Sequence, residues 1–253
     1  MEYLVNAPVT FISAGPVYAS VTVESPELAL NAVPGQFLHI RCEGYQLRRP
    51  ISIAGVEGSC VTLVFEIKGG GTQWLSRRKT GDILDVLGPL GHGFPSPANG
   101  PVLLVGGGVG VPPMHFCAQR MRNCDAVLAF RSADRALLTG EMAELCGETL
   151  VMTDDGSLGN KGFAAQGVAE MLARKRYGAV FACGPKIMLK TTLAAAQAAG
   201  VPCWVSLEER MGCGLGACLT CATPIRSADG QVVMKEACKD GPVFRGEEVV
   251  WDG

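Results

Sequence analysis

Short runs of alternating apolar and polar residues, interrupted by Gly and Pro, extend from about residue 9 to residue 86. Runs of this length, rich in Val, Ile, Thr and Phe, are typical of strands in an antiparallel barrel or sandwich. The pattern predicts strands at 20–25, 37–42, 51–56, 60–67 and 82–88. A short helix is predicted at 72–78, directly after a run of three glycines.

Beyond residue 100, apolar runs alternate with segments of helical periodicity. This alternation requires right-handed crossovers between parallel strands, so it predicts a doubly wound parallel sheet. The expected strands are 101–107, 125–132, 149–155, 178–184 and 201–207, and the expected helices are 111–123, 135–145, 164–176 and 185–200.

Between the two patterns, residues 96–101 (SPANGP) have the composition of a linker, with two prolines and an Asn-Gly pair. We therefore expect an α/β plus β protein. An antiparallel barrel domain would occupy residues 1–98 and a doubly wound domain residues 99–207. Residues 208–253 would form a small C-terminal segment.

Composition and charge narrow the class of protein. With 253 residues, 48% of them hydrophobic, the chain is long enough for two packed domains. A formal charge of −2 offers no basic surface for nucleic acid. The sequence contains no run of eighteen apolar residues, so it predicts no membrane-spanning helix. The first residues lack the basic start and apolar core of a signal peptide, so we expect a cytoplasmic protein whose eleven cysteines are not disulfide-bonded.

The stretch ERMGCGLGACLTCATP contains the most specific chemical pattern. Cys213, Cys218 and Cys221 are spaced C-x4-C-x2-C, and Cys238 follows after sixteen further residues. This is the plant-type spacing for a [2Fe-2S] cluster bound by four thiolates. A structural zinc site is an alternative, but it usually contains two C-x2-C-like pairs, and here only Cys218 and Cys221 form one. Buried thiols are a second alternative, although three cysteines in nine residues of a glycine-rich loop are unlike scattered core cysteines.

Two features of the barrel region suit a phosphate. The glycine run 69–71 with Thr72 at a predicted helix start offers free N–H groups to a pyrophosphate. Arg49 could add a charged fork. Taken singly, each has a simpler explanation, a turn with a helix cap or a solvated surface charge.

Ligands of doubly wound sheets bind beyond the carboxyl ends of the strands. Three loops fall there: a G-x-G-x-P sequence that resembles the dinucleotide fingerprint, a pair of carboxylates that could take ribose hydroxyls and would repel a 2′-phosphate, and a Cys-Gly-Pro turn. Ordinary turn chemistry is the alternative for each loop. The residues concerned are Gly108, Gly110 and Pro112, then Asp154 and Asp155, then Cys183, Gly184 and Pro185.

In this order, the segments RRPIS, GGGT, GGGVGVPPM, TDDGS, CGPKIM and CGLGACLTC resemble the ferredoxin-reductase superfamily. More narrowly, the chain resembles the electron-transfer subunits of dihydroorotate dehydrogenase B over nearly its whole length. The resemblance implies an FAD-binding barrel, an NAD-binding domain and a [2Fe-2S] appendage with Cys238 as the fourth ligand.

The resemblance also implies roles for individual residues. The segment that would lie against the flavin is Arg49, Pro50, Ile51 and Ser52, with Ser52 near the reactive nitrogen. The segment that would pass along the cofactor is Phe65, Glu66 and Ile67. The FAD pyrophosphate would be held by Gly71 and Thr72. Many relatives have Tyr in place of Ile51 and a basic residue in place of Glu66. Gly108, Gly110 and Pro112 match the nicotinamide-dinucleotide loop, and Cys183, Gly184 and Pro185 match the segment that approaches the nicotinamide.

NADH exchanges two electrons as hydride whereas a [2Fe-2S] cluster takes one, so a flavin between them is required. The resemblance supplies the other end of the route, an FMN-containing dihydroorotate dehydrogenase catalytic subunit in a heterotetramer of two copies each. Electrons would pass from that FMN to the cluster, to FAD and to NAD+, in pyrimidine (UMP) biosynthesis. Two alternatives remain: the flavin subunit of another NAD(P)H-linked complex, such as a bifurcating ferredoxin oxidoreductase, and a metal-stapled binding module without turnover.

Overall fold

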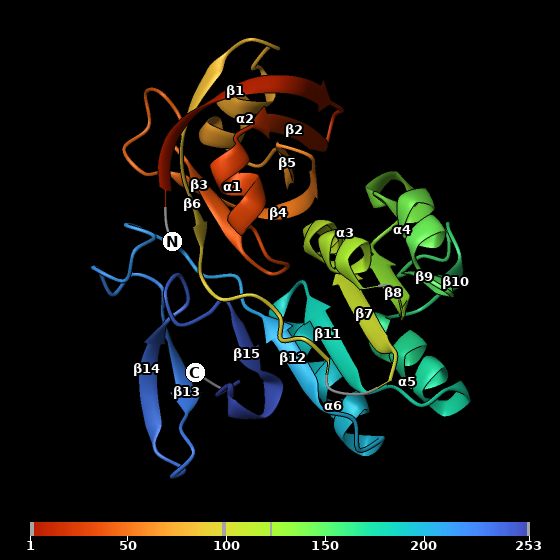
Figure 1. The fold of residues 1–253 in the computed structure, drawn as a ribbon. Coiled ribbons are helices and arrows are strands. Elements are labelled where there is room, and N and C mark those ends of the chain that lie inside the picture. The colour runs from red at the N-terminus through yellow and green to blue at the C-terminus, as the bar shows by residue number, and fades with distance from the viewer. Residues whose placement is uncertain (1–2, 98–99, 122, 252–253) are drawn as a thin grey trace.

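The computed structural model describes residues 3–97, 100–121 and 123–251. Residues 98–99, in the middle of the predicted linker, lie outside the described part. The chain forms a closed barrel, a seven-stranded sheet and a two-stranded hairpin. In Figure 1 the barrel lies above the sheet, and the hairpin lies beside the last strands of the sheet.

The barrel is antiparallel throughout, which confirms the prediction for the first part of the chain. Its strands close in the order β1-β2-β5-β4-β3-β6. Alternate residues point inward, as Val61, Leu63 and Phe65 do on β5. The strands are β1 (Tyr3–Ala14), β2 (Tyr18–Glu24), β3 (Phe37–Ile40), β4 (Arg49–Glu57), β5 (Cys60–Glu66) and β6 (Ile83–Leu90).

Two short helices accompany the barrel. Helix α1 (Pro26–Asn31) begins with a proline, and the Ser25 hydroxyl accepts a hydrogen bond from the Leu28 N–H, so the first turn is capped. Helix α2 (Gly70–Ser76) starts in the predicted glycine run.

The second part is the predicted doubly wound sheet, in the order β10-β9-β8-β7-β11-β12-β15. The five predicted strands are all present and parallel. They are β7 (Val102–Gly107), β8 (Cys124–Phe130), β9 (Thr149–Thr153), β11 (Ala179–Cys183) and β12 (Cys203–Ser206). The two-residue strand β10 (Asn160–Lys161) extends one edge. Strand β15 (Val243–Arg245), from the C-terminal segment, adds to the other edge in antiparallel orientation.

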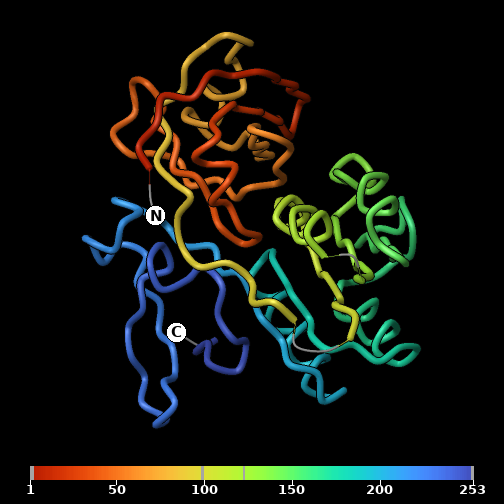
Figure 2. Tube along the Cα trace, in the orientation of Figure 1, coloured from red at the N-terminus to blue at the C-terminus, as the bar shows by residue number. Residues whose placement is uncertain are grey.

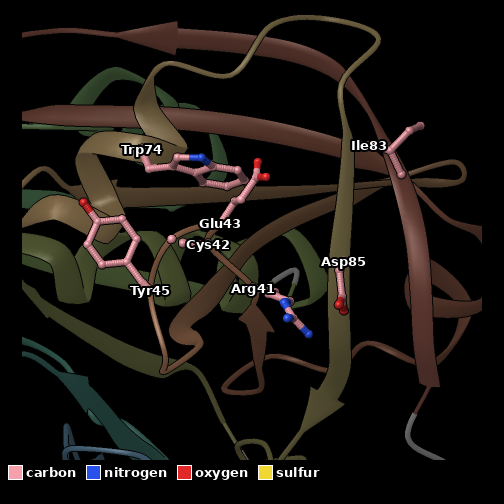
Figure 3. Close-up of a pocket in the computed structure, with 8 residues that line it drawn as sticks. Arg41, Cys42, Glu43, Tyr45, Trp74, Ile83 and Asp85 are labelled. Atoms are coloured by element: carbon pink, nitrogen blue, oxygen red, sulfur yellow. The ribbon is translucent and has the colours of Figure 1, made fainter.

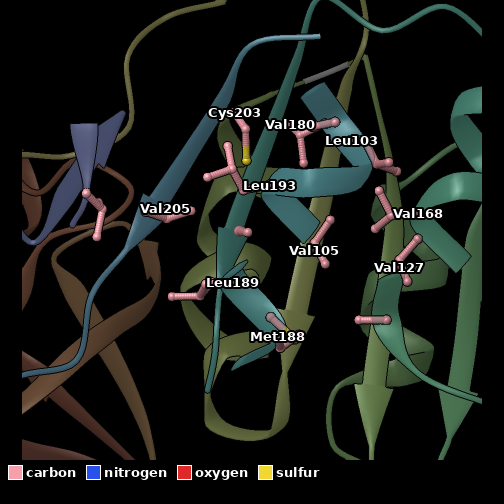
Figure 4. Close-up of a cluster of buried hydrophobic side chains, with 14 of the residues drawn as sticks. Leu103, Val105, Val127, Val168, Val180, Met188, Leu189, Leu193, Cys203 and Val205 are labelled. Atoms are coloured by element: carbon pink, nitrogen blue, oxygen red, sulfur yellow. The ribbon is translucent and has the colours of Figure 1, made fainter. Parts of the chain in front are cut away.

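Helices cover both faces of this sheet. One face packs against α5 (Ala164–Arg174) and α6 (Lys186–Ala198), with Val168 and Leu193 meeting Val105 and Val180 in the apolar core of Figure 4. The other face packs against α3 (Val111–Arg120) and α4 (Thr139–Leu145). Because the central strands β7 and β11 are covered on both sides, their sequences are unbroken apolar runs rather than alternating ones.

The segment after β12 leads through a loop to the hairpin of β13 (Ala222–Arg226) and β14 (Val232–Glu236) and then to β15. Its loop packs against the barrel, because Met211, Cys221 and Cys238 share an apolar cluster with Phe37 and Leu90. Figure 2 shows this blue segment running from the sheet to the side of the barrel. The C-terminal segment therefore touches both larger units.

Direct contacts also join the barrel to the sheet domain. Phe116 of α3 is buried in the barrel's own apolar core. The His115 Nδ1 lies 2.8 Å from the Ala54 carbonyl oxygen. A second set of contacts involves Arg135 of the sheet domain. The Tyr18 hydroxyl donates to the Arg135 carbonyl oxygen at 3.1 Å, and the Arg135 guanidinium forms an ion pair with Glu66 at 3.4 Å.

Among the described residues, no helix has the length and apolar character needed to cross a membrane.

Candidate functional site

The loop after β12 carries Cys213, Cys218 and Cys221, and Cys238, which follows β14, lies against this loop. Backbone N–H groups of that loop point at their sulfurs: Leu215 and Cys218 each donate to the Cys213 Sγ at 3.4 Å, and Gly216 donates to the Cys238 Sγ at 3.2 Å. Such donors stabilise thiolates that bind metal. The glycines allow the turn, since Gly214 and Gly216 have φ of 76° and 74°.

The cysteines lie in two pairs, Cys213 with Cys218 and Cys221 with Cys238, and the members of each pair affect each other's pKa values. Hydrogen bonding with Thr220, and then with Cys213, lowers the pKa of Cys218 to about 6. Burial, followed by the contact with the Cys221 thiol, raises the pKa of Cys238 to about 12. Within the described residues no three His, Cys, Asp or Glu side chains converge on a single ion position. Two cysteine pairs suit the two irons of a [2Fe-2S] cluster.

The predicted pyrophosphate residues meet at the start of α2. The Arg49 guanidinium lies over Gly71, where an added Cβ would be 2.3 Å from the Arg49 Nε. Thr72 ties the glycine loop together, because its Oγ1 accepts from the N–H groups of Lys68 and Gly69 at 3.0 and 3.1 Å. The guanidinium and the backbone N–H groups at the start of α2 together suit a diphosphate.

The predicted flavin residues of β4 and β5 divide between the two faces of the barrel wall. Pro50 and Ser52 lie on the outer face. Ile51 is 6% exposed and points into the barrel core, where it lies opposite Leu38. Phe65, 4% exposed, points into the same core. Side-chain contact with a flavin on the outer face is therefore open to Pro50 and Ser52, while Ile51 and Phe65 offer it only backbone.

Glu66 forms ion pairs with residues on both sides of the barrel–sheet boundary. Its carboxylate lies 2.9 Å from the Lys68 Nζ and 3.4 Å from an Arg135 nitrogen. The Ile67 side chain packs at the edge of the barrel core. Glu66 thus joins the two domains next to the predicted flavin segment.

A cavity of about 410 Å³ opens on the outer wall of the barrel beside α2 (Figure 3). Tyr45 and Trp74 contribute aromatic rings to its lining, and Arg41, Glu43 and Asp85 contribute charges. Tyr45 also connects this cavity with the pyrophosphate residues, because its ring lies 5.3 Å from the Arg49 guanidinium carbon.

The predicted nicotinamide residues come together where the strand order of the sheet reverses, between β7 and β11. The Gly108–Pro112 loop follows β7, and Cys183 ends β11, directly opposite Gly106. The two loops touch so closely that a Cβ on Gly110 would lie 2.0 Å from the Cys183 carbonyl oxygen. Pro112 is buried at the start of α3 and Pro185 precedes α6. The reversal point of an open α/β sheet is the usual place for a nucleotide.

Burial raises the pKa of the Cys183 thiol to about 12, although a hydrogen bond with Ser206 opposes this. The thiol is therefore protonated and uncharged at neutral pH. An uncharged thiol at this position adds no electrostatic repulsion toward hydride, which is negatively charged, as a thiolate would.

Asp154 and Asp155 follow β9 and are both exposed. The Asp155 carboxylate is engaged within its own turn, because it accepts from the Ser157 N–H at 2.9 Å and from the Ser157 hydroxyl at 2.6 Å. The Ser157 Oγ in turn accepts from the Ala133 N–H at 2.8 Å, so this turn is joined to the loop after β8. No hydrogen bond of this kind engages the Asp154 side chain within the described residues, which leaves its carboxylate open to a ligand.

A barrel, a doubly wound sheet and a four-cysteine loop packed against both define an oxidoreductase of the ferredoxin-reductase type with its own iron–sulfur centre. The sequence model of the iron–sulfur cluster binding domain of dihydroorotate dehydrogenase B matches residues 208–250. The chain is 41% identical to the dihydroorotate dehydrogenase B (NAD(+)) electron transfer subunit of Desulforamulus reducens, over 90% of this chain and 91% of that one. It is 42% identical to the corresponding subunit of Caldanaerobacter subterraneus, over 86% and 87% of the two chains.

A solved structure of the NADH-dependent reduced ferredoxin-NADP oxidoreductase contains a chain that is 36% identical. It superposes with a TM-score of 0.86 over 100% of this chain and 92% of that one. This protein belongs to the family of electron transfer subunits of dihydroorotate dehydrogenase B (NAD(+)). It is an NAD-linked oxidoreductase subunit, and its cofactors are FAD, a [2Fe-2S] cluster and NAD.

Sequence reasoning missed two residues near these sites. Tyr45 stands in a polar loop without periodicity, and only its contact with Arg49 connects it to the pyrophosphate residues. His39 alternates with Leu38 and Ile40 as any strand residue would, so its sequence context predicts only an ordinary packed or surface histidine. Its complete burial, with no hydrogen-bond partner, depends on residues far away in sequence.

Proposed function

We propose that this chain carries electrons between an FMN-containing dihydroorotate dehydrogenase catalytic subunit and NAD+, by way of its [2Fe-2S] cluster and FAD. The two subunits would form a heterotetramer of two copies each, acting in pyrimidine (UMP) biosynthesis. The names of the two relatives support the partner and the acceptor. The packing of the cluster loop on the barrel strand β3, next to β4, is the observation that carries the proposal, because it gives a short path from cluster to flavin.

Within this proposal, Arg49, Gly71 and Thr72 hold the FAD pyrophosphate. Pro50 and Ser52 support the flavin ring from the outer face of β4, and the Ser52 hydroxyl faces its reactive nitrogen. Backbone of Ile51 and of the Phe65–Ile67 segment lines the cofactor. The cavity bounded by Tyr45 and Trp74 adjoins the same segment, and we assign it to the adenosine half of FAD because aromatic faces suit a purine.

On the sheet domain, Gly108, Gly110 and Pro112 receive the NAD pyrophosphate, and Asp154 takes the adenosine ribose. Asp155 shapes the turn that carries Asp154. Cys183, Gly184 and Pro185 border the nicotinamide. The flavin, when bound, exchanges hydride with the nicotinamide and single electrons with the cluster. The residues contribute alignment and exclusion of water rather than proton transfer, because hydride transfer depends on orientation.

The cluster has four thiolate ligands, Cys213, Cys218, Cys221 and Cys238. A complete cysteine set also bears on the alternative function, as subunit of a bifurcating ferredoxin oxidoreductase, which the 36% identical solved chain favours. In that group a ligand other than cysteine can occur, and this chain does not need one. We therefore rank the dihydroorotate route first.

The test is reconstitution with the FMN-containing catalytic subunit. The mixed subunits should elute as one complex and should reduce NAD+ when dihydroorotate is added, whereas neither subunit alone should do so. If the complex forms but reduces NAD+ only when ferredoxin and NADPH are supplied, the bifurcating function is the better assignment. Failure of any complex to form would contradict the partner itself.

A further inference from the structure

His39 on β3 is a buried polar side chain without a partner. Its relative exposure is 0%, and neither ring nitrogen has a hydrogen bond. Leaving a buried donor or acceptor unsatisfied is energetically unfavourable. Native proteins rarely keep such a cost, and where they do a bound group often supplies the partner. The position of the ring indicates which group this is.

The strand fixes the side of the barrel on which the ring lies. Leu38 and Ile40, the neighbours of His39, point into the barrel core, so His39 points outward. Its strand partners are Pro50 on β4 and Leu87 on β6. Residues directly opposite on paired strands share a face. His39 therefore stands on the same outer face as Pro50, beside the segment assigned to the flavin.

The cluster loop covers the ring. A Cβ built on Gly214 would be 2.5 Å from the His39 Nδ1 and 3.1 Å from its Cε1, so the Nδ1 edge faces the loop beside Cys213. Gly214 also has a φ of 76°, so two independent constraints favour glycine at this position. The nearby Phe37 ring, also on β3, stands edge-on with ring centroids 6.5 Å apart. His39 thus touches the cluster loop through its ring and the β4 strand through its backbone.

An imidazole ring has at least one N–H donor, whether it is neutral or protonated. Because the Nδ1 edge faces the cluster loop, the ring can contribute a donor to that loop.

We propose that His39 is a positioning residue for the cluster: its Nδ1–H faces the loop beside Cys213 and would donate to a sulfur of the bound cluster. Hydrogen bonds to the sulfurs help to set the potential of an iron–sulfur centre. One-electron reduction would convert one iron from Fe3+ to Fe2+ and make the cluster as a whole more negative by one charge. A donor to its sulfurs would stabilise that reduced form, so His39 would raise the cluster potential. No proton is transferred and the flavin is not altered. The inference rests on the proposed route through the cluster, but the partner subunit is not needed to test it.

The experiment compares two variants of the complete chain with bound cofactors. His39→Phe keeps a flat ring of similar size and removes both nitrogens, whereas His39→Asn keeps an N–H donor at the δ position. Iron, acid-labile sulfide and FAD contents are measured first. The cluster is then titrated anaerobically with dithionite and mediators while its electron paramagnetic resonance signal is followed, and FAD is followed by its absorbance. His115→Asn, which changes a histidine bonded to Ala54 away from the loop, is the matched control.

In His39→Phe, the ratio of reduced to oxidised cluster at a fixed potential should fall at least tenfold, which is a 59 mV shift for one electron. His39→Asn should recover most of this shift, and the FAD titration and the His115→Asn cluster should match the wild type. If His39→Phe loses the cluster while His39→Asn retains it, that result also supports the donor role. Equal shifts in Phe and Asn variants, an unchanged potential in His39→Phe, or loss of the cluster in both would overturn it. Failure of the dihydroorotate route would leave these titrations unchanged, so the two proposals fail separately.

Discussion

Replacing Gly110 with Ala tests whether the nucleotide loop depends on a close backbone approach. Gly110 has a φ of −80° and a ψ of −11°, which any residue can adopt, so its need for glycine comes only from space. An added Cβ would lie 2.0 Å from the Cys183 carbonyl oxygen, 2.4 Å from its carbon and 2.7 Å from the Gly184 nitrogen, against ordinary contacts that begin at 3.4 Å. All three atoms are backbone, so no rotamer change relieves the overlap.

The magnitude follows from what must move. Strand β11 is hydrogen-bonded to β7 on one side and β12 on the other, so its end cannot shift alone. Overpacking of a rigid interior costs about 1–3 kcal/mol and sometimes more, and the backbone overlap puts Gly110→Ala at the upper end. At roughly 2–4 °C for each kcal/mol in a protein of this size, the melting temperature should fall by roughly 6–12 °C.

Gly108→Ala is the matched control in the same loop. Gly108 has a φ of 52°, and no atom lies within 4 Å of its added Cβ. Its cost is conformational, about 1 kcal/mol, but the methyl group would stand in the space that we propose for the NAD pyrophosphate. We expect Gly108→Ala to weaken NADH binding about tenfold with a small loss of stability, and Gly110→Ala to lose more stability. Thermal unfolding by circular dichroism and calorimetric titration with NADH measure the two effects. If Gly110→Ala melts with the wild type, or above Gly108→Ala, the close approach is not rigid and the reasoning is wrong.

Three further predictions concern the cluster, the nucleotide and the sheet. Cys218→Ala should abolish the [2Fe-2S] resonance signal and dihydroorotate-driven NAD+ reduction, yet keep FAD that NADH still bleaches in stopped flow; loss of FAD as well would favour a structural role for the cluster. Asp154→Asn should raise kcat/KM for NADPH about fivefold, because a carboxylate beside a 2′-phosphate costs about 1 kcal/mol, whereas Asp155→Asn should affect NADH and NADPH alike through its turn; equal NADPH gains in both variants would contradict this. Burial raises the pKa of Asp125, but hydrogen bonds from Lys175, Tyr177 and the Glu148 N–H outweigh it and hold that pKa below its ordinary value. Its stabilisation is present above the unfolded pKa of about 4 and is lost as the pH falls through the folded value, so Asp125→Asn should cost about 1–3 kcal/mol at pH 7 and progressively less below pH 4 in urea unfolding; a constant difference would refute the linkage.

The sequence predicted the barrel, the five parallel strands and the [2Fe-2S] loop because each is encoded locally, by alternation, by unbroken apolar runs or by cysteine spacing. Strand β1 and helix α1 were missed. Pro8 interrupts the apolar pattern of β1 and is compatible with a strand only through its tertiary setting, while α1 spans a single short stretch, Pro26–Asn31.

Other features could not be predicted because they are created by distant partners. Strand β15 has three residues, Val243–Arg245, too few for a periodic signal, and it exists because β12 offers a free edge. The pairing of Glu66 with Arg135 joins residues 69 positions apart. Whether Ile51 faces inward or toward a cofactor depends on the register with Leu38, which the sequence of β4 alone does not specify. The domain boundaries and the assignment of single residues to FAD and NAD stay predictions.

The pairing of β15 with β12 has a consequence for how this protein could be re-engineered. The stretch that carries the cluster leaves the sheet at β12 and returns to the same edge at β15, and the Leu207 N–H also donates to the Pro242 carbonyl at 2.9 Å. The segment between β12 and β15, which carries the four cysteines, is therefore an insertion with both of its ends fixed at the same edge of the sheet. It is not a C-terminal tail with one free end. Exchanging it for a foreign ferredoxin domain would require two splice points that stay in register, and removing it would expose the edge of the sheet to other chains. Single residues around the cysteines can therefore be substituted without altering the sheet, whereas deleting the whole segment also removes its edge strand β15.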